Sequence, residues 1–393
     1  MSIPKLKNAL IFCLLFGMLL IGCGGPIENG TLGSLGVTVI YSTCLLLVVI
    51  DLFEWRTRIP IAGVLLVFLL IRVLISFFNG RQLTYSRVVP FLVFLELPIM
   101  MTSFNESKRE TKKIIFACFW LFSFFYIALS MSDLAYIHRS NEWGNQTVDT
   151  LTLGYANPNQ TAMYLLFCLF VLQIAVSEAR NKLFRLLLVI NEIALVILIY
   201  LTQSRAGIVI SVCYLGIALI KRQNSIGRIL SRVAIFIPVI FMVFMLVGGT
   251  RFSTFEFLGE SFDTGRREIF TQAIGSLNSI ETILWGNYRM YASQNLHNSA
   301  VSILVEYGLI VLVIYEVLLA NRIKNIATSS SVRKHGTALL ALCLIVVYSS
   351  VEAAFFISGS FYAVSVFVVY YLGLPEERVA MPKERKIYEG ASD

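Results

Sequence analysis

The sequence predicts an all-α, polytopic integral membrane protein with about twelve transmembrane helices. Three observations support this fold class. Of the 393 residues, 57% are hydrophobic and only 14% are charged, whereas about a quarter of a soluble domain is charged. Apolar runs of about 20 residues, the length that crosses a bilayer as a helix, recur along the chain. Lysine and arginine gather in every second segment that connects these runs.

The predicted spans share an apolar composition and are separated by polar connections of different lengths. Their approximate limits are 8–25, 31–52, 60–79, 88–104, 114–131, 161–178, 186–202, 206–220, 233–249, 298–320, 337–356 and 359–374. The stretch 337–374 is divided because it is too long for one span and contains the polar turn Ser358-Gly359-Ser360. We therefore treat residues 1–393 as a single polytopic membrane domain.

Basic residues predict the orientation. Most of the 32 lysine and arginine residues, including every lysine, fall in the terminal segments and the even-numbered connections. Such loops are cytoplasmic, so both termini are expected to be cytoplasmic. The net charge of +8 is then a topological signal and gives no reason to expect nucleic acid binding. The sequence "LIGC" at 20–23 resembles the end of a lipoprotein signal, but the charge pattern agrees with retention of the first span.

The sequence predicts no metal ion and no nucleotide cofactor. All seven cysteines fall in predicted spans, and no pair of cysteine and histidine has the spacing of metal ligands. The cytoplasmic connections are short and contain no glycine-rich phosphate loop. Any chemistry is therefore expected on the outer face.

Three outer segments contain the polar residues of interest: 132–160, the short hairpin "TQSRAG" between the seventh and eighth spans, and 250–297. The last is one large outer loop between helices 9 and 10, and a loop of that length is usually functional. Its part "RREIFTQAIGSL" has apolar residues at helical spacing. It predicts an amphipathic helix lying against the membrane surface.

Four arginines and one histidine are the candidate functional residues of the outer face. Arg205 lies in the hairpin, and Arg266, Arg267 and Arg289 lie in the large loop. Arginine offers a planar fork of donors that suits phosphate and diphosphate better than the point charge of lysine. His297 stands at the membrane end of the large loop, where the tenth span begins.

The chain resembles the bacterial O-antigen polymerase and O-antigen ligase superfamily of membrane glycosyltransferases. Four segments within 154–315 carry the resemblance: "GYANPNQTA" (154–162), "LTQSRAG" (201–207), "TGRREIF" (264–270) followed by "ILWGN" (283–287), and "HNSAVSILVEYGLI" (297–310). One position departs from the family pattern, because Tyr288 stands where the second glycine of "G.G" is usual. The rest of the chain resembles the family in topology only.

The resemblance implies a function and a site. The protein would be a polysaccharide polymerase for O-antigen, capsule or exopolysaccharide, acting at the outer face of the cytoplasmic (inner) membrane without a metal ion. Arg205 and Arg266 would hold the undecaprenyl diphosphate of the donor, and His297 would activate the acceptor hydroxyl as a general base. Further substrate contacts would come from Ser204, Arg267, Arg289, Asn157, Asn159 and Asn298. The partners implied are the undecaprenyl-diphosphate-linked oligosaccharide, the lipid bilayer, a flippase and a chain-length regulator.

Each candidate also has a purely structural interpretation. Arg205 would serve as an interfacial anchor, and Arg266 and Arg267 as a solvated loop pair. Asn298 is a good helix cap, as are the asparagines around Pro158. Glu306 lies about 13.5 Å along a helix from His297, too far to orient it. The three carboxylates within predicted spans, Glu96, Glu192 and Glu352, are functional candidates because of their location, and pairing with Arg72 or with a neighbouring helix explains them equally well.

Two other functions compete with the polymerase. An O-antigen ligase would use the same donor but transfer the glycan to lipid A core or another acceptor. A polysaccharide transporter would also have twelve spans and two cytoplasmic termini. The spans show no repeated halves, however, and the polar residues gather in outer loops, which favours an enzyme over a transporter.

Overall fold

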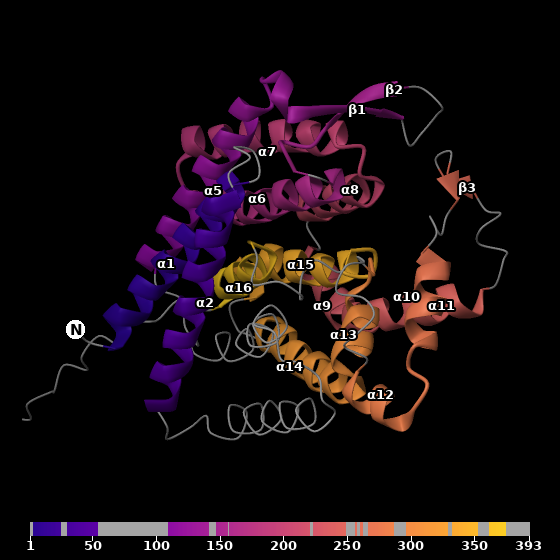
Figure 1. Cartoon of the computed structure of the whole chain (residues 1–393). Coiled ribbons are helices and arrows are strands. Elements are labelled where there is room, and N and C mark those ends of the chain that lie inside the picture. Colours follow the sequence, from indigo (N-terminus) through magenta and orange to yellow (C-terminus); the bar gives the residue numbers. More distant parts are fainter. Residues whose placement is uncertain are drawn as a thin grey trace, which may run out of the picture.

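The structure is a computed structural model that describes residues 3–24, 30–53, 109–140, 147–155, 157–220, 223–248, 256–257, 260–261, 266–286, 296–328, 332–352 and 361–374. These residues are mostly helical, which confirms the predicted helical class (Figure 1). Four helical stretches are long and apolar enough to cross a membrane: Arg109–Leu129, Pro158–Glu178, Lys182–Leu201 and Gln223–Val247. Their composition indicates a membrane protein.

In the N-terminal half, the observed helices coincide with predicted spans to within a few residues. They are α1 (Ile3–Gly24), α2 (Gly30–Phe53), α5 (Arg109–Leu129), α6 (Pro158–Glu178), α7 (Lys182–Leu201) and α8 (Arg205–Leu219). The predicted spans 60–79 and 88–104 lie outside the described residues.

The C-terminal half contains shorter helices and more breaks. They are α9 (Gln223–Val233), α10 (Ile237–Val247), α11 (Arg266–Gly275), α12 (Ile280–Trp285), α13 (Ser299–Tyr307), α14 (Leu309–Thr328), α15 (Val332–Tyr348) and α16 (Phe361–Gly373). A single 3-10 turn, Ala234–Phe236, joins α9 to α10. The predicted spans 233–249 and 359–374 correspond to α10 and α16.

The predicted tenth span, 298–320, is not one helix. It is interrupted at Gly308, which has a φ of +87° and separates α13 from α14. The chain adopts this backbone at a glycine because a side chain there would collide with the carbonyl group of Leu284 at the end of α12. The short helix α12 therefore packs directly on the break.

The predicted eleventh span, 337–356, ends as a helix at Tyr348. The amide groups of residues 349–352 still donate to carbonyl groups in the last turn of α15, as hydrogen-bonded turns. The carbonyl groups of residues 349–351 accept hydrogen bonds from other segments. Glu352 therefore lies beyond a helix end and not inside a helix, which corrects the predicted limits of this span.

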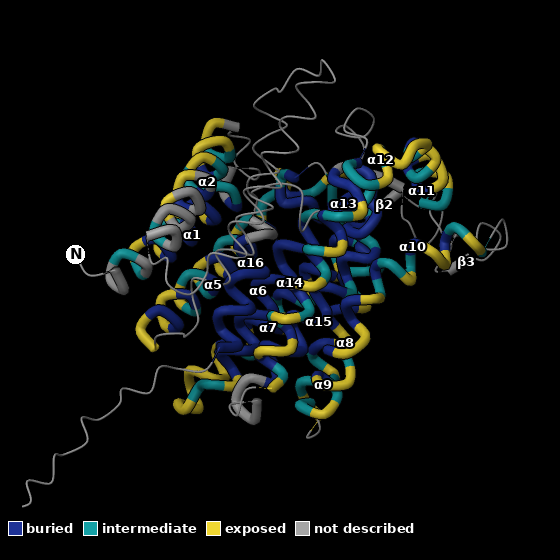
Figure 2. The backbone as a smooth tube through the Cα atoms, turned by 90° about the horizontal axis from the view of Figure 1, so that it is seen from below, coloured by how far each residue is buried: buried dark blue, intermediate teal, exposed yellow. Residues whose placement is uncertain are grey.

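The centre of the molecule is formed by α6 and α15. Almost every residue of α6 from Thr161 to Val176 is buried, and α15 is similarly enclosed from residue 336 onward. Figure 2 shows both helices in the buried colour, surrounded by helices with exposed outer faces. A helix that is apolar on all sides and enclosed on all sides must pack against other helices around its whole circumference. Packing on all sides therefore fixes the position of α6 and α15, and with it the position of the segments that follow their ends.

The surrounding helices expose apolar side chains on their outer faces. On α7, for example, Leu188 and Leu195 are buried while Ile190, Ile193 and Ile197 are more than half exposed. In water such a surface would be unfavourable, whereas lipid tails are as apolar as these side chains. The pattern agrees with helices that face a bilayer.

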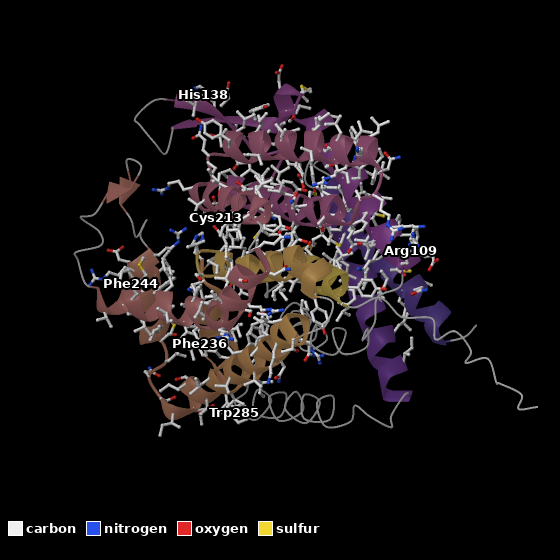
Figure 3. The ribbon with its side chains drawn as sticks, turned by 180° about the vertical axis from the view of Figure 1, so that it is seen from behind. Arg109, His138, Cys213, Phe236, Phe244 and Trp285 are labelled. Atoms are coloured by element: carbon white, nitrogen blue, oxygen red, sulfur yellow. The ribbon has the colours of Figure 1, made fainter. Side chains whose placement is uncertain are left out.

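A two-stranded antiparallel hairpin lies at one end of the bundle. Its strands are β1 (Tyr136–Ser140) and β2 (Thr147–Leu151), and His138 pairs with Asp149 across them. A second short pair consists of β3 (Glu256–Phe257) and β4 (Glu260–Ser261). Figure 3 labels Arg109, the first residue of α5, and His138, which lies beyond the last residue of that helix, and shows them far apart in the molecule.

The helix predicted from "RREIFTQAIGSL" is present as α11, but protein covers its apolar face. Phe270 and Ala273 are fully buried in a cluster that includes Met245 of α10 and Val301 of α13. The prediction that this face lies on the membrane surface is therefore wrong. Because its apolar side is used for packing, α11 is fixed to the same end of the bundle as β3 and the end of α10 (Figure 1).

Candidate functional site

Residues 349–352, which follow α15, hold two other segments of the chain. The carbonyl of Ser349 accepts from the backbone of Ser299 at 2.9 Å, and that of Ser350 accepts from the Asn298 amide at 3.0 Å. The carbonyl of Val351 accepts from Arg266 at 3.5 Å. The carbonyl groups at a helix end need partners from elsewhere. Here those partners bring the start of α11 and the start of α13 together.

His297 and Glu352 form the first contact of this site. The Nδ1 atom of His297 lies 3.3 Å from Oε1 of Glu352, and these side chains are 25% and 5% exposed. A carboxylate can only accept, so this contact places the proton of a neutral imidazole on Nδ1. The Nε2 atom of His297 is then left with a lone pair. Such an imidazole can accept a proton from a substrate.

The backbone of His297 is strained. Its φ is +49°, in the left-handed region that non-glycine residues seldom adopt. Gln203, directly before Ser204, has a φ of +57°, and Leu153 has a φ of +49°. These are the only non-glycine residues with positive φ in the described part of the chain, and all three lie within or beside the outer segments predicted from the sequence. Strained residues cluster at functional sites, where the surrounding structure imposes the conformation.

Arg266 and Arg205 are each the first residue of a helix. Arg266 begins α11 and Arg205 begins α8. A cation at a helix N-terminus opposes the helix dipole, at a cost of about 0.3–1 kcal/mol. Helix stability therefore does not account for these two arginines. Together with the amide groups of a first helical turn, a guanidinium at this position favours an anionic ligand.

Ser204 and Tyr348 connect the hairpin before α8 to the end of α15. The buried Tyr348 side chain lies near Ser204, Glu352 and Arg266. Ser204 is 1% exposed, and its hydroxyl also caps α8 by accepting from the amide of Gly207 at 3.3 Å. Arg205 directly follows Ser204, which lies near Tyr348, and the Arg205 side chain is partly exposed.

The hairpin can approach the core closely because Gly207 has no side chain. A β-carbon there would lie 3.0 Å from that of Ala162 on α6 and 3.2 Å from the Ser204 hydroxyl. Both distances are tighter than ordinary contacts, so the glycine of "TQSRAG" sets how near α8 starts to α6.

The predicted substrate contacts Asn157 and Asn298 both cap helices. The side-chain oxygen of Asn157 accepts from the amide of Asn159 at 2.9 Å, at the start of α6. That of Asn298 accepts from the amide of Val301 at 3.0 Å, at the start of α13. Asn298 is fully buried, whereas Asn157 and Asn159 are partly exposed. The caps explain why α6 and α13 begin at these residues.

The remaining predicted site residues differ in what the structure says of them. Arg267 is partly buried, and its Nε atom has no hydrogen-bond partner among the described residues. Arg289 lies outside the described residues. No group of three or more histidine, cysteine, aspartate or glutamate side chains in the described ranges is arranged to hold a metal ion.

Comparisons with protein-family models, with curated proteins and with solved structures gave no match for this chain. The resemblance to the O-antigen polymerase and ligase superfamily therefore rests on the four sequence segments quoted above. Three of those segments, at 201–207, 264–270 and 297–310, supply residues to the contacts around 348–352.

The sequence does not predict the place of two residues of the site. It marks Glu352 as a carboxylate inside a span, either functional or paired with Arg72 or a neighbouring helix, and it does not single out Tyr348. The structure pairs Glu352 with His297. Serines at 349 and 350 followed by a glutamate were a usable signal, because such a polar group is unusual in the middle of a membrane span.

Proposed function

We propose that this protein is a membrane glycosyltransferase that polymerises a polysaccharide from undecaprenyl-diphosphate-linked units. The observation that carries the proposal is the pairing of His297 with Glu352 beside Arg266, at one end of an apolar helical bundle. A proton acceptor and an arginine that suits a diphosphate are the two groups that this transfer requires on the protein side.

The reaction joins two lipid-linked saccharides. A hydroxyl of the acceptor unit attacks the anomeric carbon of the donor chain, and the bond from that carbon to the undecaprenyl diphosphate breaks. The bonding electrons leave with the diphosphate, which gains negative charge. His297 takes the hydroxyl proton on Nε2, and Glu352 stabilises the resulting imidazolium. Arg266 and Arg205 stabilise the diphosphate where charge develops.

The proposal includes the membrane arrangement predicted from the basic residues. The chain would cross the cytoplasmic membrane about twelve times, with both termini in the cytoplasm and the site facing outward. An undecaprenyl diphosphate group lies at the membrane surface, which is where the ends of spanning helices also lie. A flippase would deliver the donor to this face, and a chain-length regulator would act beside the enzyme.

A polymerase assay with purified protein tests the proposal. The protein in lipid nanodiscs is incubated with undecaprenyl-diphosphate oligosaccharide, and the products are separated on a gel. A ladder of regular increments is expected from the wild type and none from His297→Ala. The matched control is His138→Ala, because His138 is exposed on the hairpin and pairs only with Asp149 in the described structure. A ladder of wild-type intensity from His297→Ala would remove His297 from the mechanism, and the absence of a ladder from the wild type would contradict the proposed function.

The same donor chemistry would serve an O-antigen ligase, and the acceptor separates the two functions. Lipid A core is offered as a competing acceptor in the same reaction. A polymerase extends the lipid-linked unit into a ladder whether or not lipid A core is present. Transfer of a single glycan to lipid A core, without a ladder, would identify a ligase instead.

A further inference from the structure

The Asn298 side chain connects three elements at the proposed catalytic site. Its amide nitrogen donates to the carbonyl of Pro238 in α10 at 3.1 Å and to that of Ser350 at 3.0 Å. Its oxygen accepts from the amide of Val301 in α13 at 3.0 Å. The side chain is fully buried, so protein groups use both hydrogens of its amide nitrogen and no solvent competes for them.

The residue next to this hydrogen-bond network is His297. His297 directly precedes Asn298 and has the strained φ of +49°, while Asn298 itself is extended with a φ of −157°. The Asn298 amide is bound to Ser350, and the His297 imidazole is bound to Glu352 two residues further on. The adjacent residues His297 and Asn298 therefore both bond to the segment that follows α15.

We propose that Asn298 is a positioning residue that holds His297 in its left-handed backbone conformation, with Nδ1 on Glu352 and Nε2 directed to the acceptor. The inference rests on the proposed function for its catalytic consequence. It replaces the expectation that Asn298 contacts substrate, because each polar atom of its side chain already has a protein partner. Asn298 acts on the reaction only through His297.

Two substitutions separate capping from positioning. Asn298→Ser keeps a side-chain oxygen that can cap α13, but it is too short to reach the carbonyls of Pro238 and Ser350. Asn298→Asp keeps the size and the capping oxygen, and it removes at least one of the two donated hydrogens. The matched control is Asn181→Ser at the start of α7. Asn181 also caps a helix, through the amides of Leu183 and Phe184, but it is exposed and lies away from the site.

The first readout is steady-state kinetics of the inserted protein. Both Asn298 variants are expected to lose between about tenfold and about a hundredfold in kcat with little change in KM, because the base is displaced while the substrate contacts remain. Asn181→Ser is expected to keep the wild-type kcat. Wild-type kcat in both Asn298 variants, with His297→Ala inactive, would overturn the positioning role and leave the proposed function intact.

The second readout needs no transferase activity. Diethyl pyrocarbonate modifies the free nitrogen of an imidazole, and mass spectrometry gives the rate at each histidine. The exposed His138 is the internal reference. In both Asn298 variants the rate at His297 relative to His138 is expected to change, because both the exposure and the basicity of Nε2 depend on the contact between Nδ1 and Glu352. An unchanged ratio would overturn the inference whether or not the protein is a transferase. A changed ratio, together with no product ladder from the wild type, would reject only the proposed function.

Discussion

The Nδ1 atom of His297 lies 3.3 Å from Oε1 of Glu352, although 55 positions separate the two residues in the chain. Glu352 is almost completely buried, whereas His297 is partly exposed. Glu352 is therefore the interior member of the pair, and His297 is the member that solvent or a ligand can reach. A histidine held in this way by a carboxylate has a defined tautomer and a defined orientation.

The pairing predicts the effect of removing the carboxylate charge. Glu352→Gln keeps the size of the side chain but no longer stabilises an imidazolium at His297. In the polymerase assay we expect a loss in kcat that is large but smaller than the loss of roughly 10²–10⁴-fold expected for His297→Ala. Glu281→Gln is the control, because Glu281 is exposed on α12. Equal activity of Glu352→Gln and the wild type would remove Glu352 from the mechanism.

Arg205 predicts a distinction between charge and geometry. If its planar fork binds the diphosphate, Arg205→Lys should lose nearly as much activity as Arg205→Ala, since an ammonium keeps the charge but not the paired donors. The variants are compared by product ladders at saturating donor. Arg185→Lys is the matched control, because Arg185 is exposed near the start of α7. Rescue by lysine would mean that charge alone is needed, and full activity of Arg205→Ala would make this residue only an anchor.

The break between α13 and α14 predicts a stability effect. Gly308→Ala places a side chain at a φ of +87° and against the Leu284 carbonyl, so we expect the free energy of unfolding to fall by about 2 kcal/mol or more. Thermal unfolding of the purified protein in detergent measures this as a lower Tm. Gly216→Ala on α8 is the control, because nothing lies within 4 Å of the added carbon. A helical Gly→Ala change without a clash should raise stability by about 0.5–1 kcal/mol. Equal Tm values for the two variants would show that α12 does not pack on Gly308.

The orientation of the chain predicts where tags are accessible. A reporter inserted at residue 110 or 225 should lie in the cytoplasm, and one at 145 or 275 should lie outside. Residue 110 lies at the start of α5, and residue 275 lies at the end of α11. Residue 145 lies outside the described residues. A cytoplasmic signal from residue 275 would separate Arg266 from any exported donor and would contradict the proposed site.

Much of the helical architecture is predictable because it depends on local composition. An apolar run of about 20 residues favours a spanning helix wherever it occurs, and α1, α2, α5, α6, α7 and α8 lie within a few residues of their predicted limits. Helix starts are also local. Asn157, Ser204 and Asn298 cap the helices that follow them, and side chains of this type prefer that position in any fold.

The predictions that failed concern contacts between distant segments. The apolar face of α11 is visible in the sequence, but only its packing on α10 and α13 decides that protein and not lipid covers it. Gly308 is compatible with an unbroken helix by composition, and the break exists because α12 occupies the space beside it. Hydrophobic periodicity shows which face of a helix is apolar. It does not show whether that face packs against another helix or against lipid.

The sequence by itself determined the helical class of the protein and the approximate positions of its helices up to α8, and it supplied the residue types on which the proposed site rests. Only the tertiary structure decided that His297 meets Glu352 and that Arg266 meets Val351. The physical reason is that α15 stops at Tyr348, and the carbonyls that a longer helix would have satisfied internally are bonded instead to α11 and α13. Which segments supply those partners depends on how the buried helices α6 and α15 set the ends of their neighbours, and no local pattern contains that information.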